Sequence, residues 1–193
     1  MSLQNNALCG IDEAGRGCVG GSLFVSGVIL DENIPPKLLE SLKDSKKLTQ
    51  KKRDCLAPKI KAHSCFFIVE KSAKEIDEIG LSKAIKDSLL EIMGKLKAEI
   101  YLFDGNCNYG ISSLQTLIKG DSKVPSISAA SILSKSAKDS QMEALHEIYP
   151  QYNFAKNKGY VTKEHLESIQ KYGLCKEHRK SYRLKALQKS LFN

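Results

Sequence analysis

The apolar residues of the chain form two kinds of pattern, continuous runs of strand length and longer stretches with helical spacing. The strand-like runs are residues 7–12, 22–30, 64–70, 99–104 and 112–118. The first two flank a segment containing Gly15, Gly17, Gly20 and Gly21, so we expect them to pair as a β-hairpin.

Helical spacing and helix-boundary residues occupy much of the remaining chain. We expect a short helix from Pro35–Pro36 through Lys43, and a second helix capped by Thr49 that Pro58 interrupts or ends. Further helices are expected over 74–97, from Pro125 onward, near 162–171 and near 181–191. The small residues after Pro125 would let that helix lie close against a sheet.

This order of elements predicts a mixed sheet covered by helices. The 193 residues are enough for one domain with a substantial core. After Pro150 the chain becomes polar and basic. We therefore expect a core over 1–149 and a helical C-terminal segment over 150–193, packed together as a single structural unit.

The net charge of +8 favours a polyanionic partner such as nucleic acid, or an acidic membrane surface. No apolar run approaches the roughly 20 residues that span a bilayer, and the N-terminus shows no signal-peptide pattern. The six cysteines are scattered without metal-ligand spacing. We expect a cytoplasmic protein with free thiols and no membrane association.

Acidic residues follow three of the strand-like runs, where they would be costly unless solvated, hydrogen-bonded or neutralised. Asp12 and Glu13 lie in GIDEAGRG (10–17), Asp104 ends IYLFD, and Asp121 follows LIKG. Acids at strand ends tend to face the crevice where ligands bind. Together they would either have raised pKa values or bind a divalent metal ion.

Oxygen ligands without clustered His or Cys favour a hard cation, Mg²⁺ or Mn²⁺. A pair of such ions suits in-line displacement at a phosphodiester. Because neighbouring strand residues point to opposite faces, Asp12 and Glu13 can serve one site only if the strand bends or ends there. A solvated strand terminus is the simpler interpretation of each acid taken alone.

Six sequence blocks, in order, resemble the type 2 ribonuclease H family, in its bacterial ribonuclease HII branch. They are GIDEAGRG (10–17), DSKKLTQKKR (44–53), LFDG (102–105), GDSKVPSISAASILSK (120–135), NKGYVTKEH (157–165) and EHRKSY (177–182). The resemblance covers nearly the full chain. It implies the ribonuclease H-like three-layer α/β/α fold with a mixed central sheet.

The resemblance also implies a metal-dependent endonuclease that cleaves the RNA strand of RNA–DNA hybrids. Such an enzyme incises 5′ of single ribonucleotides embedded in duplex DNA and leaves 5′-phosphate and 3′-hydroxyl ends. The implied catalytic and metal-binding residues are Asp12, Glu13, Asp104 and Asp121. Paired Mg²⁺ or Mn²⁺ ions would be the cofactor, and we expect the protein to be a monomer.

Substrate contacts are implied at eight further positions. Gly15, Arg16 and Gly17 would sense the ribose 2′-hydroxyl, largely through backbone groups, and Tyr160 would stack on a sugar. Plausible phosphate contacts are Lys46, Lys47, Lys123 and Ser126.

The sequence departs from the family pattern in two places, and other functions remain open. Cys18–Val19 stands where a proline and a small or apolar residue are expected, and Tyr182 replaces a more usual phenylalanine, which we assign to packing. One alternative is another two-metal phosphodiesterase of similar fold, resolvase-like or transposase-like. The second is a non-catalytic nucleic-acid-binding module.

Overall fold

A five-stranded mixed sheet forms the centre of the computed structural model, which describes residues 7–42 and 48–182. Its strands are β1 (Leu8–Ala14), β2 (Leu23–Leu30), β3 (Ser64–Lys71), β4 (Ile100–Asp104) and β5 (Leu114–Leu117). They lie in the order β3-β2-β1-β4-β5. The pairs β1–β2 and β2–β3 are antiparallel, whereas β1–β4 and β4–β5 are parallel. The predicted hairpin and all five predicted strands are confirmed.

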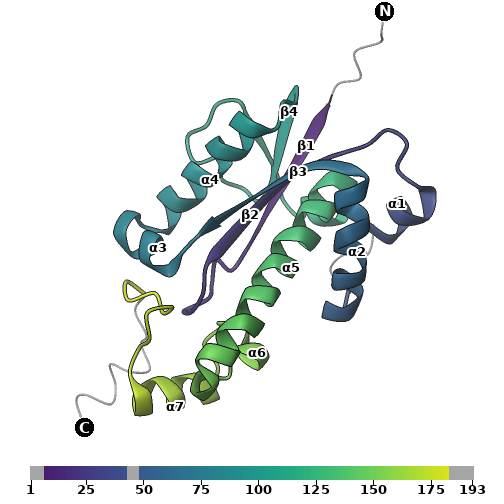
Figure 1. The fold of residues 1–193 in the computed structure, drawn as a ribbon. Helices are drawn as coiled ribbons and strands as arrows, with labels where there is room; N and C mark the ends of the chain where they lie inside the picture. The colour runs from purple at the N-terminus through teal and green to yellow at the C-terminus, as the bar shows by residue number, and fades with distance from the viewer. Residues whose placement is uncertain (1–6, 43–47, 183–193) are drawn as a thin grey trace, which may run out of the picture.

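Helices cover both faces of this sheet (Figure 1). The helices are α1 (Pro36–Leu42), α2 (Gln50–Ala62), α3 (Ala73–Ile79), α4 (Leu81–Lys95), α5 (Pro125–Ile148), α6 (Phe154–Asn157) and α7 (Lys163–Tyr172). Short 3₁₀ turns lie at Gly120–Ser122 and Pro150–Tyr152. One apolar cluster joins the sheet to α3 and α4, and a second joins it to α1, α2 and α5. The three-layer α/β/α arrangement is confirmed.

Two helix predictions differ from the structure. Thr49 caps α2 as expected, but Pro58 lies inside the helix and does not end it. Proline removes one backbone hydrogen bond, and the burial of Ala57 and Ile60 on either side holds the helix together across that gap. The helix expected over 74–97 is two helices, because Gly80, with a φ of 82°, ends α3 and begins α4. All but the first two positions of the helix expected near 181–191 lie outside the described residues.

Helix α5 lies directly on β1, and the small residues at its start make this close approach possible. Ser126, Ser128, Ala129, Ala130 and Ser131 are all buried. Gly10 faces them from the strand. A Cβ at Gly10 would lie 2.3 Å from the backbone nitrogen of Ile127, so only glycine fits there.

The C-terminal part of the described chain packs on the far end of α5. A third apolar cluster joins Met142 and Leu145 of α5 to Tyr152, Phe154 and Ile169. In Figure 1, α6 and α7 lie beside the C-terminal end of α5. The boundary placed between residues 149 and 150 remains a prediction.

No helix in the described ranges is both long enough and apolar enough to span a bilayer. The six cysteines, all of them within those ranges, form no disulfide with one another.

The contact between β1 and α5 generates a stability prediction. Gly10→Ala should lower the free energy of unfolding by at least about 2 kcal/mol, because the new methyl group meets backbone atoms that cannot rotate away. Gly94→Ala is the matched control, since a Cβ there has no neighbour within 4 Å. That change should stabilise α4 by about 0.5–1 kcal/mol. Urea unfolding of both variants measures the difference, and an unchanged Gly10→Ala midpoint would contradict the packing described.

Candidate active site

Asp12 and Glu13 lie inside β1, opposite Ser26 and Val25 of β2. The strand runs through both residues and ends one residue later, at Ala14. On its other side β1 pairs with β4 only as far as Ile11 and Phe103. Because β4 ends one residue later at Asp104, the two acids of β1 and the acid of β4 meet where the parallel ladder stops.

The carboxyl group of Asp12 is buried, with 7% of the residue exposed. Burial raises its pKa from 3.8 to about 7, and the charges of Glu13 and Asp104 add to the increase. A hydrogen bond with Ser131 and the ammonium group of Lys135, both on α5, act in the opposite direction. The raised pKa indicates that the surrounding protein groups do not fully neutralise the negative charge of the ionised Asp12 carboxylate.

The carboxyl group of Glu13 is in a similar position. Burial raises its pKa, the guanidinium of Arg16 lowers it, and Asp104 raises it further. Oε1 lies 3.4 Å from Nη1 of Arg16. The other oxygen, Oε2, is buried and has no hydrogen-bond partner among the described residues. Burying a carboxylate oxygen without a hydrogen-bond partner lowers the stability of the fold unless a cation binds that oxygen.

Asp104 connects these acids to the beginning of α5. Its Oδ1 accepts a hydrogen bond of 2.9 Å from the backbone nitrogen of Gly120. Asp121 follows immediately, in the 3₁₀ turn that precedes α5, and is also buried. Asp104 therefore binds Gly120, the residue that directly precedes Asp121 in the chain.

The donor set fits a hard divalent cation. Within the described ranges, no group of three or more His, Cys, Asp or Glu side chains is placed so that it could hold a metal ion. The four acids nevertheless offer only oxygen donors, which Mg²⁺ and Mn²⁺ prefer. The raised pKa of Asp12 and the unpartnered Oε2 of Glu13 are what a cation in this position would relieve.

The loop over residues 15–17 and Tyr160 lie together, although they are far apart in the sequence. A Cβ on Gly17 would lie 3.8 Å from the ring of Tyr160. The backbone nitrogens of Val19 and Gly20 both donate to the carbonyl of Gly159. Tyr160 is 47% exposed, so part of its ring is available to a ligand beside this loop.

Two histidine side chains, joined by a hydrogen bond, hold the backbone of Tyr160. Nδ1 of His165 lies 2.8 Å from the Tyr160 carbonyl, and its Nε2 lies 3.0 Å from Nε2 of His178. Since Nδ1 of His178 accepts from the backbone nitrogen of Cys175, one neutral tautomer of each ring satisfies all three bonds. Burial lowers both pKa values, that of His178 to about 4. The two neutral rings therefore hold the Tyr160 backbone through one continuous chain of hydrogen bonds.

The side chain of Arg16 contacts Glu13 and Tyr109. Its Nη1 is 3.4 Å from Oε1 of Glu13, and its Nη2 donates to the hydroxyl of Tyr109 at 3.0 Å. Tyr109 comes from the loop after β4. Nothing in the position of Tyr109 along the chain indicates a contact with residue 16, so Tyr109 was not among the predicted site residues.

Three basic residues near the site were not predicted to be there. Lys135 and Lys138 lie on the face of α5 that covers β1, and Nζ of Lys138 is 4.7 Å from the centre of the Tyr160 ring. The guanidinium of Arg179 is fully buried behind residues 15–21. For Lys135 and Lys138, the signal available in the sequence was their spacing from Ser131 along one helix face.

The four predicted phosphate contacts have different outcomes. Lys123 is exposed just before α5. Ser126 is buried against Gly10, and its hydroxyl has no hydrogen-bond partner among the described residues; its phosphate contact stays a prediction. Lys46 and Lys47 lie outside the described residues.

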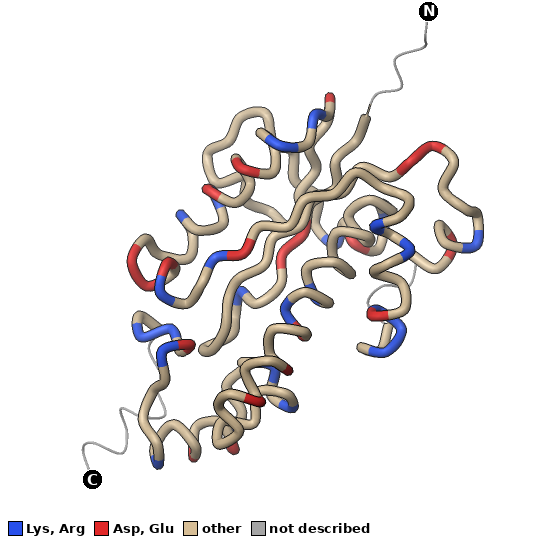
Figure 2. The backbone as a smooth tube through the Cα atoms, viewed as in Figure 1, with Lys and Arg blue, Asp and Glu red and all other residues tan. Residues whose placement is uncertain are grey.

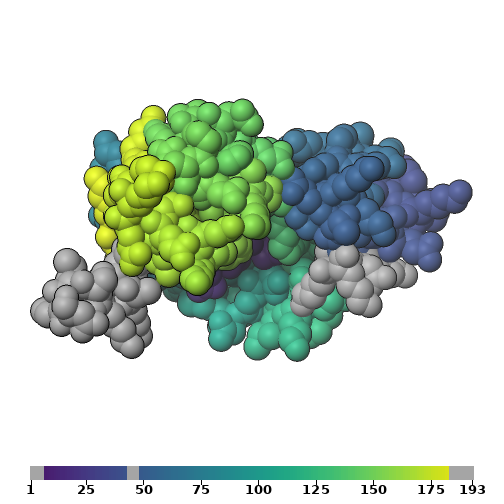
Figure 3. Space-filling model, turned by 90° about the horizontal axis from the view of Figure 1, so that it is seen from below, coloured from purple at the N-terminus to yellow at the C-terminus, as the bar shows by residue number. Residues whose placement is uncertain are grey.

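The surface near these elements is hollowed. Seen from below, the purple N-terminal residues are visible in a depression between the green C-terminal half and the teal residues (Figure 3). Figure 2 shows acidic residues on the central strands, while the helices carry both basic and acidic residues.

The mixed sheet between helical layers, with acids where β1 and β4 part, defines a nuclease of the ribonuclease H-like fold. The family model described as ribonuclease HII matches residues 9–187. The chain belongs to the ribonuclease HII family and is an endoribonuclease.

Individual relatives agree with this assignment. The chain is 46% identical to the ribonuclease HII of a Sulfurovum species over 187 residues, covering 97% of each chain. It is 48% identical to that of Aliarcobacter butzleri over 194 residues, covering 96% of this chain and 98% of the relative. Among solved structures it is similar to the ribonuclease HII of Archaeoglobus fulgidus in complex with PCNA. That match has a TM-score of 0.80 and 28% identity, over 92% of this chain and 96% of the other.

The burial of Asp12 generates a pH-dependent prediction. Because its folded pKa is raised, this group stabilises the fold below about pH 4, and the stabilisation is lost as the pH rises through 7. In protein stripped of divalent cations, Asp12→Asn should therefore be more stable than wild type at pH 8, by about 4 kcal/mol. The gain should shrink steadily toward pH 4.

Urea unfolding from pH 4 to pH 8 measures this difference. Asp31→Asn makes the same chemical change at an exposed position and should show no comparable trend. A gain for Asp12→Asn that stays constant with pH would contradict the raised pKa.

Proposed function

We propose that this protein cleaves the RNA strand of RNA–DNA hybrids and incises 5′ of single ribonucleotides embedded in duplex DNA. The products would carry 5′-phosphate and 3′-hydroxyl ends. The observation that carries the proposal is the coupling of Asp12, Glu13 and Asp104 at the end of the β1–β4 ladder, beside the loop over 15–17. Asp121 completes the proposed set of catalytic acids.

Asp12, Glu13, Asp104 and Asp121 are proposed to hold Mg²⁺ or Mn²⁺. Bound there, a pair of such cations would favour ionisation of the attacking water and stabilise the departing 3′ oxygen. The buried carboxylates contribute by staying fixed under α5, so that little reorganisation is needed when charge develops on the phosphate.

Recognition of ribose is assigned to the loop over residues 15–17. The 2′-hydroxyl is the group that distinguishes RNA from DNA at a given position. Gly17 is exposed and carries no Cβ, so its backbone can approach a sugar closely. The ring of Tyr160 lies beside Gly17, where it would stack against the sugar on the DNA side of the junction.

Phosphate contacts are proposed for Lys46, Lys47, Lys123 and Ser126. The net charge of +8 supports sequence-independent binding of a nucleic acid backbone. The proposal requires one copy of the chain and no membrane, so we expect a monomer. The unpaired cysteines support a cytoplasmic location.

The alternatives make different predictions. A resolvase-like or transposase-like enzyme of similar fold would cut all-DNA substrates as well as ribonucleotide-containing ones, and the loop over 15–17 would then have no function in specificity. A non-catalytic binding module would not need the four acids at all. Buried acids are costly to keep, which favours an enzyme over a binding module.

Incision of a labelled duplex tests the proposed function. A DNA duplex with one ribonucleotide should be nicked just 5′ of it in the presence of Mg²⁺ or Mn²⁺, whereas the all-DNA duplex should remain intact. Asp104→Asn should lower the rate by about 100-fold or more, because a cation ligand is lost. Asp31→Asn, with the same change on the surface, should cut at the wild-type rate. Full activity of Asp104→Asn would contradict the assignment of the acids.

The proposed stacking on Tyr160 predicts a dependence on the aromatic ring. Tyr160→Ala should lower kcat/KM on the same duplex by about tenfold or more, whereas Tyr160→Phe should retain most of it. Tyr172→Ala removes a comparably exposed ring on α7 and should have little effect. Equal losses for Tyr160→Phe and Tyr160→Ala would point to the hydroxyl and against stacking.

A further inference from the structure

The backbone carbonyl of Arg16, in the middle of the proposed ribose-sensing loop, is held by the C-terminal segment. The hydroxyl of Tyr182 donates to it at 2.9 Å, and Nη1 of Arg179 donates at 3.4 Å. Nη1 of Arg179 also donates to the Tyr182 hydroxyl at 2.8 Å. The hydroxyl therefore accepts from one side and donates to the other, so its single proton is directed at the Arg16 carbonyl.

Arg179 fixes the other end of the same loop. Its Nε donates to the carbonyl of Gly21 at 3.0 Å, and its backbone nitrogen donates to the carbonyl of Val19 at 2.8 Å. The guanidinium is fully buried and lies over the ring of Tyr182, 5.2 Å from its centre. Burying a guanidinium is costly where its donors lack acceptors. Nε and Nη1 of Arg179 find acceptors in this loop and in Tyr182, whereas Nη2 is buried without a hydrogen-bond partner among the described residues.

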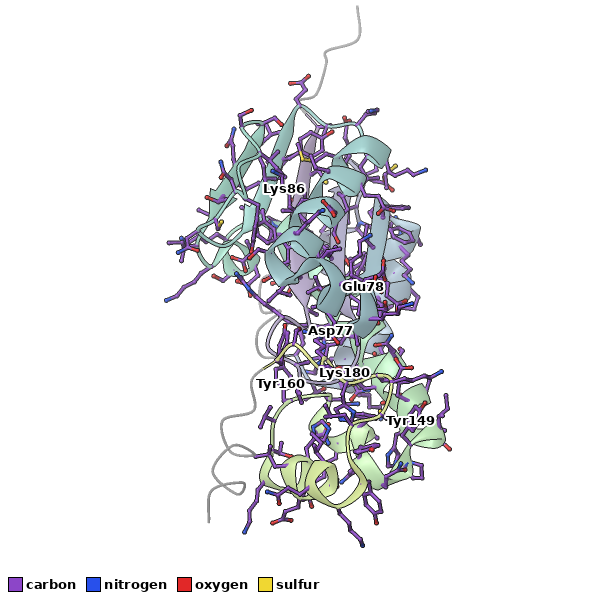
Figure 4. All side chains as sticks on the ribbon, turned by 90° about the vertical axis from the view of Figure 1, so that its left-hand side faces the viewer. Asp77, Glu78, Lys86, Tyr149, Tyr160 and Lys180 are labelled. Carbon is purple, nitrogen blue, oxygen red and sulfur yellow. The ribbon has the colours of Figure 1, made fainter. Side chains whose placement is uncertain are left out.

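A surface carboxylate on another element anchors the segment that carries Tyr182. Asp77 of α3 accepts from the backbone nitrogens of Lys180 and Ser181, at 2.8 and 2.9 Å. It also accepts from the hydroxyl of Ser181 at 2.6 Å. Figure 4 shows Asp77 and Lys180 where the C-terminal segment passes α3. Three charge-assisted bonds to one carboxylate fix the backbone just before residue 182.

We propose that Tyr182 is a positioning residue that strengthens the preference of this chain for ribonucleotides over deoxyribonucleotides, and that Asp77 holds it in place. The inference rests on the proposed function of the loop over 15–17. A loop that senses a hydroxyl through its backbone must be held within about 0.5 Å of its productive position. The Tyr182 hydroxyl adds a restraint through Arg16 that the phenylalanine more usual at this position could not give, because phenylalanine has no group that donates to the carbonyl.

Tyr182→Phe tests the proposal, because it removes the hydroxyl and leaves the ring. On the single-ribonucleotide duplex kcat/KM should fall by about fivefold to tenfold, the scale of one hydrogen bond in a positioning network. The loss should be mainly in kcat. Affinity for an all-DNA duplex, which depends on phosphate contacts, should stay unchanged.

Two further measurements separate positioning from general stability. Hydrogen exchange should become faster in the peptide covering 15–21 and remain unchanged in α4. Asp77→Ala should give the same loss of kcat, and the double variant should lose no more than either single one, because both changes release the same restraint.

Tyr101→Phe is the matched control. The Tyr101 hydroxyl bonds the backbone of Leu96 and Ala98 beside the beginning of β4, outside the proposed site. This variant should keep wild-type kcat/KM and wild-type exchange over 15–21.

The outcomes distinguish the two proposals. If wild type incises at the ribonucleotide and Tyr182→Phe matches it in kcat/KM and in exchange over 15–21, the positioning role is wrong and the proposed function stands. If folded, metal-loaded wild type cuts neither substrate, the proposed function fails together with the inference that rests on it.

Discussion

The close contact between β1 and α5 is the constraint on which the rest of the structure depends. It requires glycine at position 10, where any side chain would meet the helix backbone. The same contact buries Asp12 two residues later, within reach of Ser131 and Lys135 on the helix. A carboxylate in the middle of a sheet is unfavourable. The apolar clusters on both faces supply the stability that lets the chain keep one there.

The strand arrangement determines where the acids can act. Because β4 stops at Asp104 while β1 continues to Ala14, the acids lie at the edge of the parallel ladder and not within it. The backbone bond from Gly120 to Asp104 then brings the beginning of α5 to the same place. Three separate stretches of sequence therefore bring Asp12 and Glu13, Asp104 and, through its neighbour Gly120, Asp121 to this part of the sheet.

Much of this arrangement was predictable from the sequence, for identifiable reasons. Continuous apolar runs gave the five strands, and the acids at their ends indicated the candidate site. Two local signals were misleading. Pro58 suggested an interruption, but α2 continues past it, and the apolar spacing over 74–97 suggested one helix, although Gly80 divides it into two. The metal-binding role came from the acids together with the resemblance to a family, the substrate roles came from the resemblance, and both remain predictions.

What the sequence could not show are contacts between distant segments. The bond from Tyr182 to Arg16 joins residues 166 positions apart, and no spacing rule predicts it. From the sequence Tyr182 was assigned to packing, because its hydroxyl had no visible partner. In the structure the ring lies against Arg179 and the hydroxyl reaches a backbone carbonyl of the loop. A tyrosine in place of a phenylalanine looks conservative in the sequence, yet here it adds a directional hydrogen bond. The role of a residue in a sequence motif can therefore be interpreted only when its neighbours in the folded protein are known.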